Sequence, residues 1–233
     1  MIPKIIHQIW FGNQSNRPVK WMETFPMKNP DWTYKLWTEE NLPKLFNQDK
    51  FAYILRHETS VDKYAKLADI ARYEILYQYG GIYIDADSEC LKSLDPLINN
   101  EIFSVRGNEK TSELISNAII GCAPGNSAIK EMIDHIASLD NSLLSQTFAW
   151  KITGPVLWTK ILSNHPEVKI YDSIYFLPTR HPEDFFGMFR RRNVKNSYTN
   201  HHWSTTHKLI KRFIIDIFTP RKVIRYMKNL LRK

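Results

Sequence analysis

Two hydrophobic periodicities alternate along this chain, and their alternation predicts a class of fold. Helical spacing of apolar residues predicts a helix over 61–79, another over 126–139, and a third beginning at Gly154-Pro155. Thr38, followed by two glutamates, is typical of a helix N-cap. Short apolar, aromatic and β-branched runs predict strands at 4–11, 31–38, 82–84, 101–106, 118–122 and 168–176. We therefore expect an α/β fold, Rossmann-like, with a mostly parallel central sheet and helices on both faces.

The stretch GGIYIDADSECL, residues 80–91, ends an apolar strand with two acids. Side chains at i and i+2 of a strand share a face about 7 Å apart, so Asp85 and Asp87 would repel each other. A hard divalent cation such as Mg²⁺ or Mn²⁺ would relieve this repulsion. Either the backbone bends after Ile84 so that both acids bind directly, or one acts through water or a ligand hydroxyl. The alternative without a ligand is a solvated strand end.

The helix before this stretch carries two more charged residues, Asp69 and Arg72, which stand three apart and share a face. Gly80 is placed to end that helix, and Gly81 to release the chain into the next strand. An ordinary i,i+3 salt bridge that contributes little is the simple interpretation of Asp69 and Arg72. The functional interpretation is that this charged helix face lies above the strand end that carries Asp85 and Asp87, and contributes to the same site.

Composition favours one large domain with a sizeable core. The 233 residues are 43% hydrophobic and 24% charged, with seven Trp, and show no internal repeat. Two cysteines, Cys90 and Cys122, give neither a disulfide framework nor metal-ligand spacing, so a reducing compartment is expected. We see neither a signal-peptide core nor a membrane-spanning run, and expect a cytoplasmic protein.

The net charge of +8 belongs to the C-terminus. Residues 208–233 hold nine Lys or Arg and one acid, Asp216, which leaves residues 1–207 neutral. Apolar positions in this tail recur at helical spacing on both sides of Pro220, which predicts an amphipathic, basic helical tail. We expect it to lie on an anionic membrane. Packing on the domain is the alternative, and nucleic-acid binding is disfavoured because no recognition signature accompanies the charge.

A longer pattern joins the helix to the acids and resembles glycosyltransferase family 32, which includes yeast mannosyltransferases and bacterial capsule enzymes. The resemblance runs from about residue 2 to 203, and includes the opening IPKIIHQIWFG, Thr153-Gly154-Pro155 and His201-His202-Trp203. The signature A-x-x-x-D-x-x-R-x-x-x-L-x-x-x-G-G-x-Y-x-D-x-D is matched by Ala65, Asp69, Arg72, Leu76, Gly80, Gly81, Tyr83, Asp85 and Asp87.

The resemblance implies a GT-A fold in residues 1–207 and a nucleotide-sugar donor whose diphosphate is bridged by Mn²⁺ or Mg²⁺. It implies that Asp87 binds the metal directly, that Asp85 lies near the metal and the ribose, and that a third protein ligand comes from 201–203, for which we assign His202. An imidazole ligand suits Mn²⁺ better than Mg²⁺.

The resemblance also implies a donor site. Asp69 and Arg72 would hold the sugar hydroxyls and phosphate, with Arg72 as a second cationic clamp beside the metal. Trp10 would stack on the nucleobase, although core packing explains it equally well, and Gly81 is included in the donor site. Family resemblance implies retention of anomeric configuration, and no protein nucleophile is assigned.

The function expected is sugar transfer to a glycan or lipid-linked saccharide in bacterial capsule or O-antigen synthesis, at the inner face of the cell membrane. One rival is a D-x-D phosphohydrolase of the haloacid dehalogenase type, whose nucleophile also ends an apolar strand. There the motif closes the first strand and has Thr or Val two residues beyond it, whereas here it is mid-chain and Glu89 stands at that position. The other rival, a non-catalytic membrane adaptor, leaves the pattern from Asp69 to Asp87 unexplained.

Overall fold

A computed structural model describes residues 1–109, 112–179 and 194–203. The chain forms two compact units. The first comprises Met1–Pro178 and Arg192–His201 and holds every element described below. In the second unit, the described residues show the Trp203 indole N–H donating to the Thr179 carbonyl at 2.6 Å. The predicted tail, 208–233, and the domain boundary at 207 lie outside the described residues.

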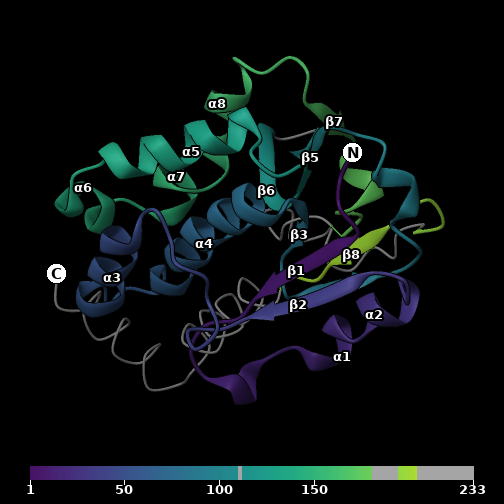
Figure 1. The fold of residues 1–233 in the computed structure, drawn as a ribbon, viewed down its shortest axis with the longest axis horizontal. Helices are drawn as coiled ribbons and strands as arrows, with labels where there is room; N and C mark the ends of the chain where they lie inside the picture. Colours follow the sequence, from purple (N-terminus) through teal and green to yellow (C-terminus); the bar gives the residue numbers. More distant parts are fainter. Residues whose placement is uncertain (110–111, 180–193, 204–233) are drawn as a thin grey trace, which may run out of the picture. The chain divides into compact units, whose positions relative to one another are not determined.

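A six-stranded sheet forms the centre of the first unit, with the order β2-β1-β3-β6-β5-β7 (Figure 1). Strand β1 pairs in parallel with β2 and β3, and β5 pairs in parallel with β7, while β6 runs antiparallel to β3 and β5. The predicted α/β class with a mostly parallel sheet is thus confirmed. The strands are β1 (Ile5–Ile9), β2 (Thr33–Trp37), β3 (Gly81–Ile84), β5 (Ile102–Asn108), β6 (Ser112–Cys122) and β7 (Lys169–Tyr171).

Helices cover both faces of this sheet, as Figure 1 shows. On one side lie α4 (Lys63–Tyr79), α5 (Ser127–Ser138) and α8 (Pro155–Leu162), and on the other α1 (Val19–Met22) and α2 (Thr24–Lys28). The remaining helices and turns are α3 (Gln48–His57), α6 (Asn141–Gln146), α7 (Ala149–Ile152), η1 (Gln14–Asn16), η2 (Asp95–Leu97) and η3 (Ser173–Tyr175).

Two predicted elements differ from the structure. The segment after Thr38 is a turn closed by the Asn41 side chain, which accepts from the Thr38 amide at 2.7 Å, and the next helix begins only at Gln48. Pro43 explains this, because it disfavours helix at the residue before it. The strand predicted over 168–176 is only the three residues of β7, followed by the turn η3.

Helix α4 is the central helix of the unit. Every position from Lys66 to Leu76 except Ala68 is buried, because α4 packs on α5, α3 and α7 as well as on the sheet. A helix that is covered on most sides must bury its charged residues too, so Asp69 and Arg72 form a buried i,i+3 salt bridge.

The turn from α4 into β3 is built on two glycines. Gly80 and Gly81 have φ of 62° and 94°, a region that L side chains rarely adopt. A Cβ on Gly81 would lie 2.6 Å from the Ile5 carbonyl oxygen and 2.9 Å from His7 Nε2. His7 Nε2 donates to the Gly80 carbonyl at 2.9 Å, while His7 Nδ1 accepts from the Trp37 indole N–H at 3.0 Å. These contacts fix the start of β3 against β1.

A second, two-stranded sheet follows β3. Strand β4 (Ser88–Cys90) pairs antiparallel with β8 (Thr199–His201), in a register that sets Ser88 opposite His201. A residue far along the chain is thereby placed next to Asp87. Within residues 1–109, 112–179 and 194–203, no helix combines the length and apolar character needed to cross a bilayer.

Candidate active site

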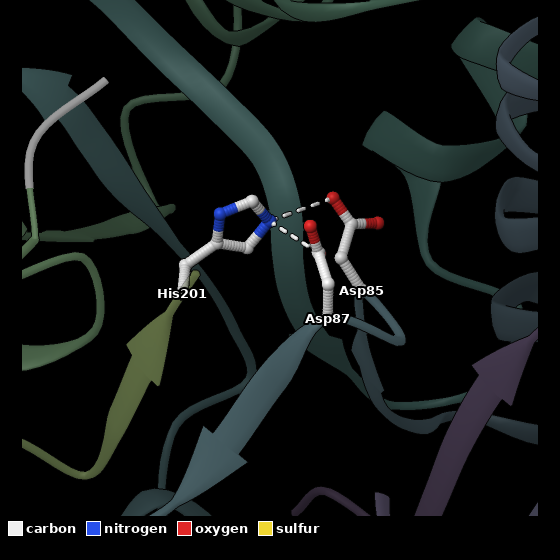
Figure 2. A group of neighbouring side chains, drawn as sticks. All are labelled: Asp85, Asp87 and His201. Carbon is white, nitrogen blue, oxygen red and sulfur yellow. Dashed lines mark hydrogen bonds and ion pairs between the residues drawn. The ribbon is translucent and has the colours of Figure 1, made fainter. Parts of the chain in front are cut away.

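Two carboxylates and an imidazole converge where β3 ends (Figure 2). His201 Nε2 lies 3.0 Å from Asp87 Oδ1 and 3.4 Å from Asp85 Oδ2. One ligand atom from each of the three residues lies within 4.8 Å of the other two, so together they could hold a metal ion. Asp85 and Asp87 are partly exposed, at 27% and 15% of their side chains, whereas His201 is buried.

The backbone bends between the two acids, which is the first of the two geometries expected from the sequence. The Asp85 amide still belongs to the sheet, since it donates to the Ala118 carbonyl at 2.9 Å. The Ser88 amide then donates back to the Asp85 carbonyl at 3.0 Å, which closes a turn. Asp85 and Asp87 therefore approach the same nitrogen rather than standing a full strand repeat apart.

The electrostatics of the cluster fit a cation. Burial alone would lower the pKa of His201, but the charge of Asp87 and the hydrogen bonds that the imidazole donates to both carboxylates raise it to about 10. An imidazolium thus balances two carboxylates in the structure. A divalent ion would supply that positive charge instead, with two carboxylate oxygens and a neutral imidazole nitrogen as ligands, a donor set that suits Mn²⁺.

The third member of the cluster is His201, whereas the sequence prediction named its neighbour His202. The reason is the alternation of side chains along β8: His201 ends the strand on the side that faces Asp85 and Asp87, and the next residue leaves the strand. The duplicated histidine left the choice open in the sequence, and only the register with Ser88 resolves it.

Arg72 connects the metal-ligand candidates to α4. Its Nη1 lies 3.3 Å from Asp85 Oδ1, its Nη2 lies 3.0 Å from Asp69 Oδ1, and its guanidinium sits 4.4 Å from the centre of the Tyr83 ring. It also donates to the Asn117 carbonyl. Burial opposes the charge of Arg72, but Tyr83 and the two carboxylates raise its pKa, so it is a fixed cation beside Asp85.

Asp69 is surrounded by donors. Its Oδ1 accepts from the Asn117 amide at 2.8 Å, and its Oδ2 accepts from the Thr153 hydroxyl at 2.7 Å, in addition to the Arg72 contact. Burial raises the pKa of Asp69 to about 6, against the opposing effect of Arg72. Within the structure, this carboxylate holds Arg72 in position.

Sequence reasoning missed two parts of this arrangement. Asn117 comes from β6, and its amide bridges Asp69 and the Tyr73 hydroxyl, to which it donates at 3.0 Å. A single asparagine in a strand gives no signal of that role. Thr153 was noted as a family landmark, but its bond to a carboxylate on α4 could not be inferred from sequence spacing.

The other two predicted donor-site residues lie apart from this cluster. Trp10 follows β1, is half-buried, and donates from its indole N–H to the Asn13 carbonyl at 3.1 Å. The β1 strand ends on the same side of the sheet as β3, because the two are parallel. Gly81 is buried at the opposite end of β3, against Ile5 and His7, so the structure does not bring it to this cluster, and its place in the donor site stays a prediction.

A mostly parallel sheet with helices on both faces, and a carboxylate pair at the carboxyl end of an internal strand, are the features expected of the GT-A fold, because open α/β sheets bind ligands at the carboxyl ends of their strands. Residues 15–104 match the family model described as "Glycosyltransferase sugar-binding region containing DXD motif". The predicted resemblance to family 32 and the predicted GT-A fold are therefore confirmed.

Relatives and solved structures agree with this class. The chain is 29% identical to inositol phosphoceramide mannosyltransferase 3 of Schizosaccharomyces pombe, over 87% of this chain and 60% of the relative. It is 37% identical to mannosyl phosphorylinositol ceramide synthase CSH1 of Saccharomyces cerevisiae, over 53% of this chain and 32% of the relative. The solved PaToxG glycosyltransferase has the same fold, with a TM-score of 0.57 at 22% identity over 71% of this chain and 70% of that one. The chain thus spans 60% and 32% of the lengths of the two curated relatives.

Proposed function

We propose that this chain is a divalent-metal-dependent glycosyltransferase that moves a sugar from a nucleotide-sugar donor to a hydroxyl of a lipid or glycan acceptor. The observation that carries the proposal is the convergence of Asp85, Asp87 and His201 beside the fixed cation Arg72. The matched sugar-binding region supports it, because that region contains these two acids.

Each residue has a role that follows from its surroundings. Asp85, Asp87 and His201 would hold the ion, and when bound it supplies positive charge to the diphosphate leaving group. Tyr83 donates from its hydroxyl to Asp85 Oδ1 at 2.7 Å, which orients that carboxylate. Arg72 offers a second positive charge that burial and Asp69 hold in place, so it needs no reorganisation during the reaction.

We propose retention of anomeric configuration on the strength of the family resemblance, with the acceptor hydroxyl attacking on the face that the diphosphate leaves. That hydroxyl would pass its proton to the departing phosphate. Trp10 is proposed to stack on the nucleobase, because it is half-buried and lies where β1 ends.

The names of the relatives bear on the donor and the acceptor. Both yeast relatives are named for mannosyl transfer to inositol phosphoceramide or for its product. We therefore propose mannose as the sugar and a sphingolipid-type headgroup as the acceptor, in place of the capsule or O-antigen expected from the sequence. Membrane attachment through residues 208–233 and a location at a cytoplasmic membrane face stay proposals that rest on the sequence.

The two rivals lose support. A haloacid dehalogenase would use the first Asp of the motif as its nucleophile. Here the carboxylate of Asp85 is already bound by Arg72, Tyr83 and His201. A non-catalytic adaptor would have no use for the buried polar group around Asp69, because apolar residues in its place would give a core of similar or greater stability.

A donor and metal screen tests the proposal. Purified chain is incubated with GDP-mannose, UDP-glucose and other nucleotide sugars, with Mn²⁺, Mg²⁺ or chelator, while the unfolding midpoint and nucleotide release are followed. We expect one donor to raise the midpoint only with metal, because ligand binding to the folded state stabilises it. Metal-independent turnover, or no response to any sugar nucleotide, would contradict the proposal.

The neighbouring histidines provide a matched pair for the metal assignment. His201→Gln removes a ligand and is expected to weaken Mn²⁺ binding about tenfold or more, whereas His202→Gln leaves it unchanged. Titration of each variant with Mn²⁺, monitored by electron paramagnetic resonance, measures this directly. Equal loss in both variants would remove His201 from the site.

A further inference from the structure

Four exposed apolar side chains gather around the start of α4 and around α7. We name Val61, Tyr64, Phe148 and Trp150 the aromatic rim; they are 77%, 47%, 62% and 47% exposed. Isolated exposed apolar residues are ordinary, but a group of them rimmed by polar residues marks a surface for a partner.

Two hydrogen bonds bring the two segments of the rim together. The Ala149 amide donates to Asp62 Oδ2 at 3.0 Å, so the neighbours of these residues, Val61 and Phe148, flank one hydrogen bond. A second tie, from Lys66 Nζ to the Ser145 carbonyl at 2.9 Å, holds α4 to the segment before α7. The aromatic rim is therefore one surface rather than two separate loops.

The aromatic rim borders the candidate active site. Trp150 lies in α7, which ends at Ile152, and the next residue, Thr153, bonds Asp69. On the other side, the Tyr64 ring packs against Gly12, where a Cβ would lie 2.8 Å from Tyr64 Cζ. Gly12 follows Trp10 by two residues, so the rim adjoins the end of β1 as well as the helix that carries Arg72.

Two lysines border the rim, and one acid, Glu39, lies at its Gly12 edge, where it accepts from the Gly12 amide at 2.6 Å. Lys151 Nζ lies 5.0 Å from the centre of the Trp150 ring, and Lys63 begins α4 between Val61 and Tyr64. The acid between them, Asp62, is engaged by the Ala149 amide. Exposed aromatic rings with lysines beside them are typical of surfaces that enter the headgroup layer of an anionic bilayer.

We propose that the aromatic rim docks this domain on an anionic lipid surface, with the candidate active site turned toward the headgroups, so that the acceptor is a membrane lipid headgroup. The acceptor part rests on the proposed function; the docking part does not. Lys151 beside Trp150 and Lys63 beside Tyr64 favour anionic lipid over an apolar protein partner. The position beside Thr153 and Gly12 explains why the surface would serve acceptor delivery.

Site-specific fluorescence tests the docking. Phe148→Cys and, as a matched control on α2, Met27→Cys are labelled with an environment-sensitive fluorophore; Met27 is 75% exposed. The native Cys90 and Cys122 are buried, and burial raises the pKa of Cys90 to about 11, so labelling is selective. Phosphatidylcholine vesicles are added with and without phosphatidylinositol, an anionic lipid with free hydroxyls.

The proposal expects a blue shift of the label at 148 with anionic vesicles and none at 27. It is overturned if the label at 148 stays unchanged while the protein floats with vesicles, because another segment then does the docking. A shift at both positions also overturns it, as does a label at 148 that is already shifted without lipid, since protein then covers the rim.

A second measurement separates docking from catalysis. The double variant Phe148→Ser, Trp150→Ser is expected to lower transfer to a vesicle-borne acceptor about tenfold while leaving donor hydrolysis in solution unchanged. Met27→Ser should change neither, and equal transfer in the double variant would contradict the docking. If the unsubstituted chain neither binds a sugar nucleotide nor transfers its sugar, the proposed function fails, and the fluorescence shift still decides the docking.

Discussion

Two polar groups share one connected network, and their surroundings differ: a buried group around Asp69, and an open group formed by Asp85, Asp87 and His201. Asp69 is buried and receives bonds from Arg72, Asn117 and Thr153. Asp85 and Asp87 are partly open and converge on one imidazole nitrogen. A carboxylate whose hydrogen-bond donors all come from the protein holds its neighbours in place. A pair of carboxylates that share one protein cation can still bind a metal ion.

Arg72 joins the two groups, since it contacts Asp69 on one side and Asp85 on the other. The buried group therefore positions the cation that the open group uses. Substitutions in the open group should therefore lower activity first, and substitutions in the buried group should lower stability first.

The largest expected effect is on the open side. Asp87→Asn keeps the shape of the side chain but removes a metal ligand, so kcat/KM should fall more than about a hundredfold at saturating Mn²⁺. The unfolding midpoint should stay near that of the unsubstituted protein, because Asp87 is partly exposed. Asp134→Asn, in an exposed ion pair with Lys130, is the control. Turnover close to that of the unsubstituted chain would remove Asp87 from the metal site.

The same substitution on the buried side should act on stability first. Asp69→Asn leaves Arg72 with less compensation and puts an amide where Asn117 and Thr153 both donate, so unfolding should cost about 3 kcal/mol less. Urea denaturation measures this change. A stability equal to that of Asp87→Asn would show that the two groups do not differ as described.

The turn from α4 into β3 should respond to acid through His7, which bonds the Gly80 carbonyl. Burial lowers its pKa from 6.5 to about 4, so the unfolded chain binds the proton first. Stability should be fully present above about pH 6.5 and decline toward pH 4, by on the order of 2–3 kcal/mol.

His7→Gln serves as the comparison, because it retains an amide donor for the Gly80 carbonyl but does not titrate. The quantity to measure is the difference between the two proteins in urea denaturation at each pH. Asp69 has a raised pKa and shifts stability in the opposite direction, and the difference cancels that contribution. Parallel pH profiles for the two proteins would exclude His7 as the source.

The smallest effect is expected at the edge of the buried group. Thr153→Val removes one donor to Asp69 and should cost about 1 kcal/mol of stability together with a measurable loss of transfer. Thr159→Val is the matched control on α8, because that hydroxyl accepts from the Ile115 amide away from the site. It should lower stability alone. If both variants lose transfer equally, Thr153 has no specific link to the reaction.

The open group was largely predictable from sequence, because it is local. Helical spacing located α4, the two glycines marked its end, and Asp85 with Asp87 followed at once. The bend that brings the acids together was one of two expected geometries, and the hydrogen bond from Ser88 to Asp85 decides it.

The buried group was not predictable, because each of its contacts joins distant segments. Asn117 and Thr153 lie 48 and 84 residues from Asp69 and reach it only through the pairing of β6 with β3 and the packing of α7 on α4. Sequence spacing placed Asp69 and Arg72 on one helix face but did not show that this face is buried, as it is in the structure.

The pairing of β4 with β8 has a consequence for how the chain is held together. His201 is 116 residues from Asp85, so an ion shared by them would close a long loop and act as a removable cross-link. Closing a loop of that length restricts the unfolded chain more than it restricts the folded one. Metal supply would then set how tightly the segment that carries His201 is fastened, and cleavage of that segment by protease should slow as Mn²⁺ is added.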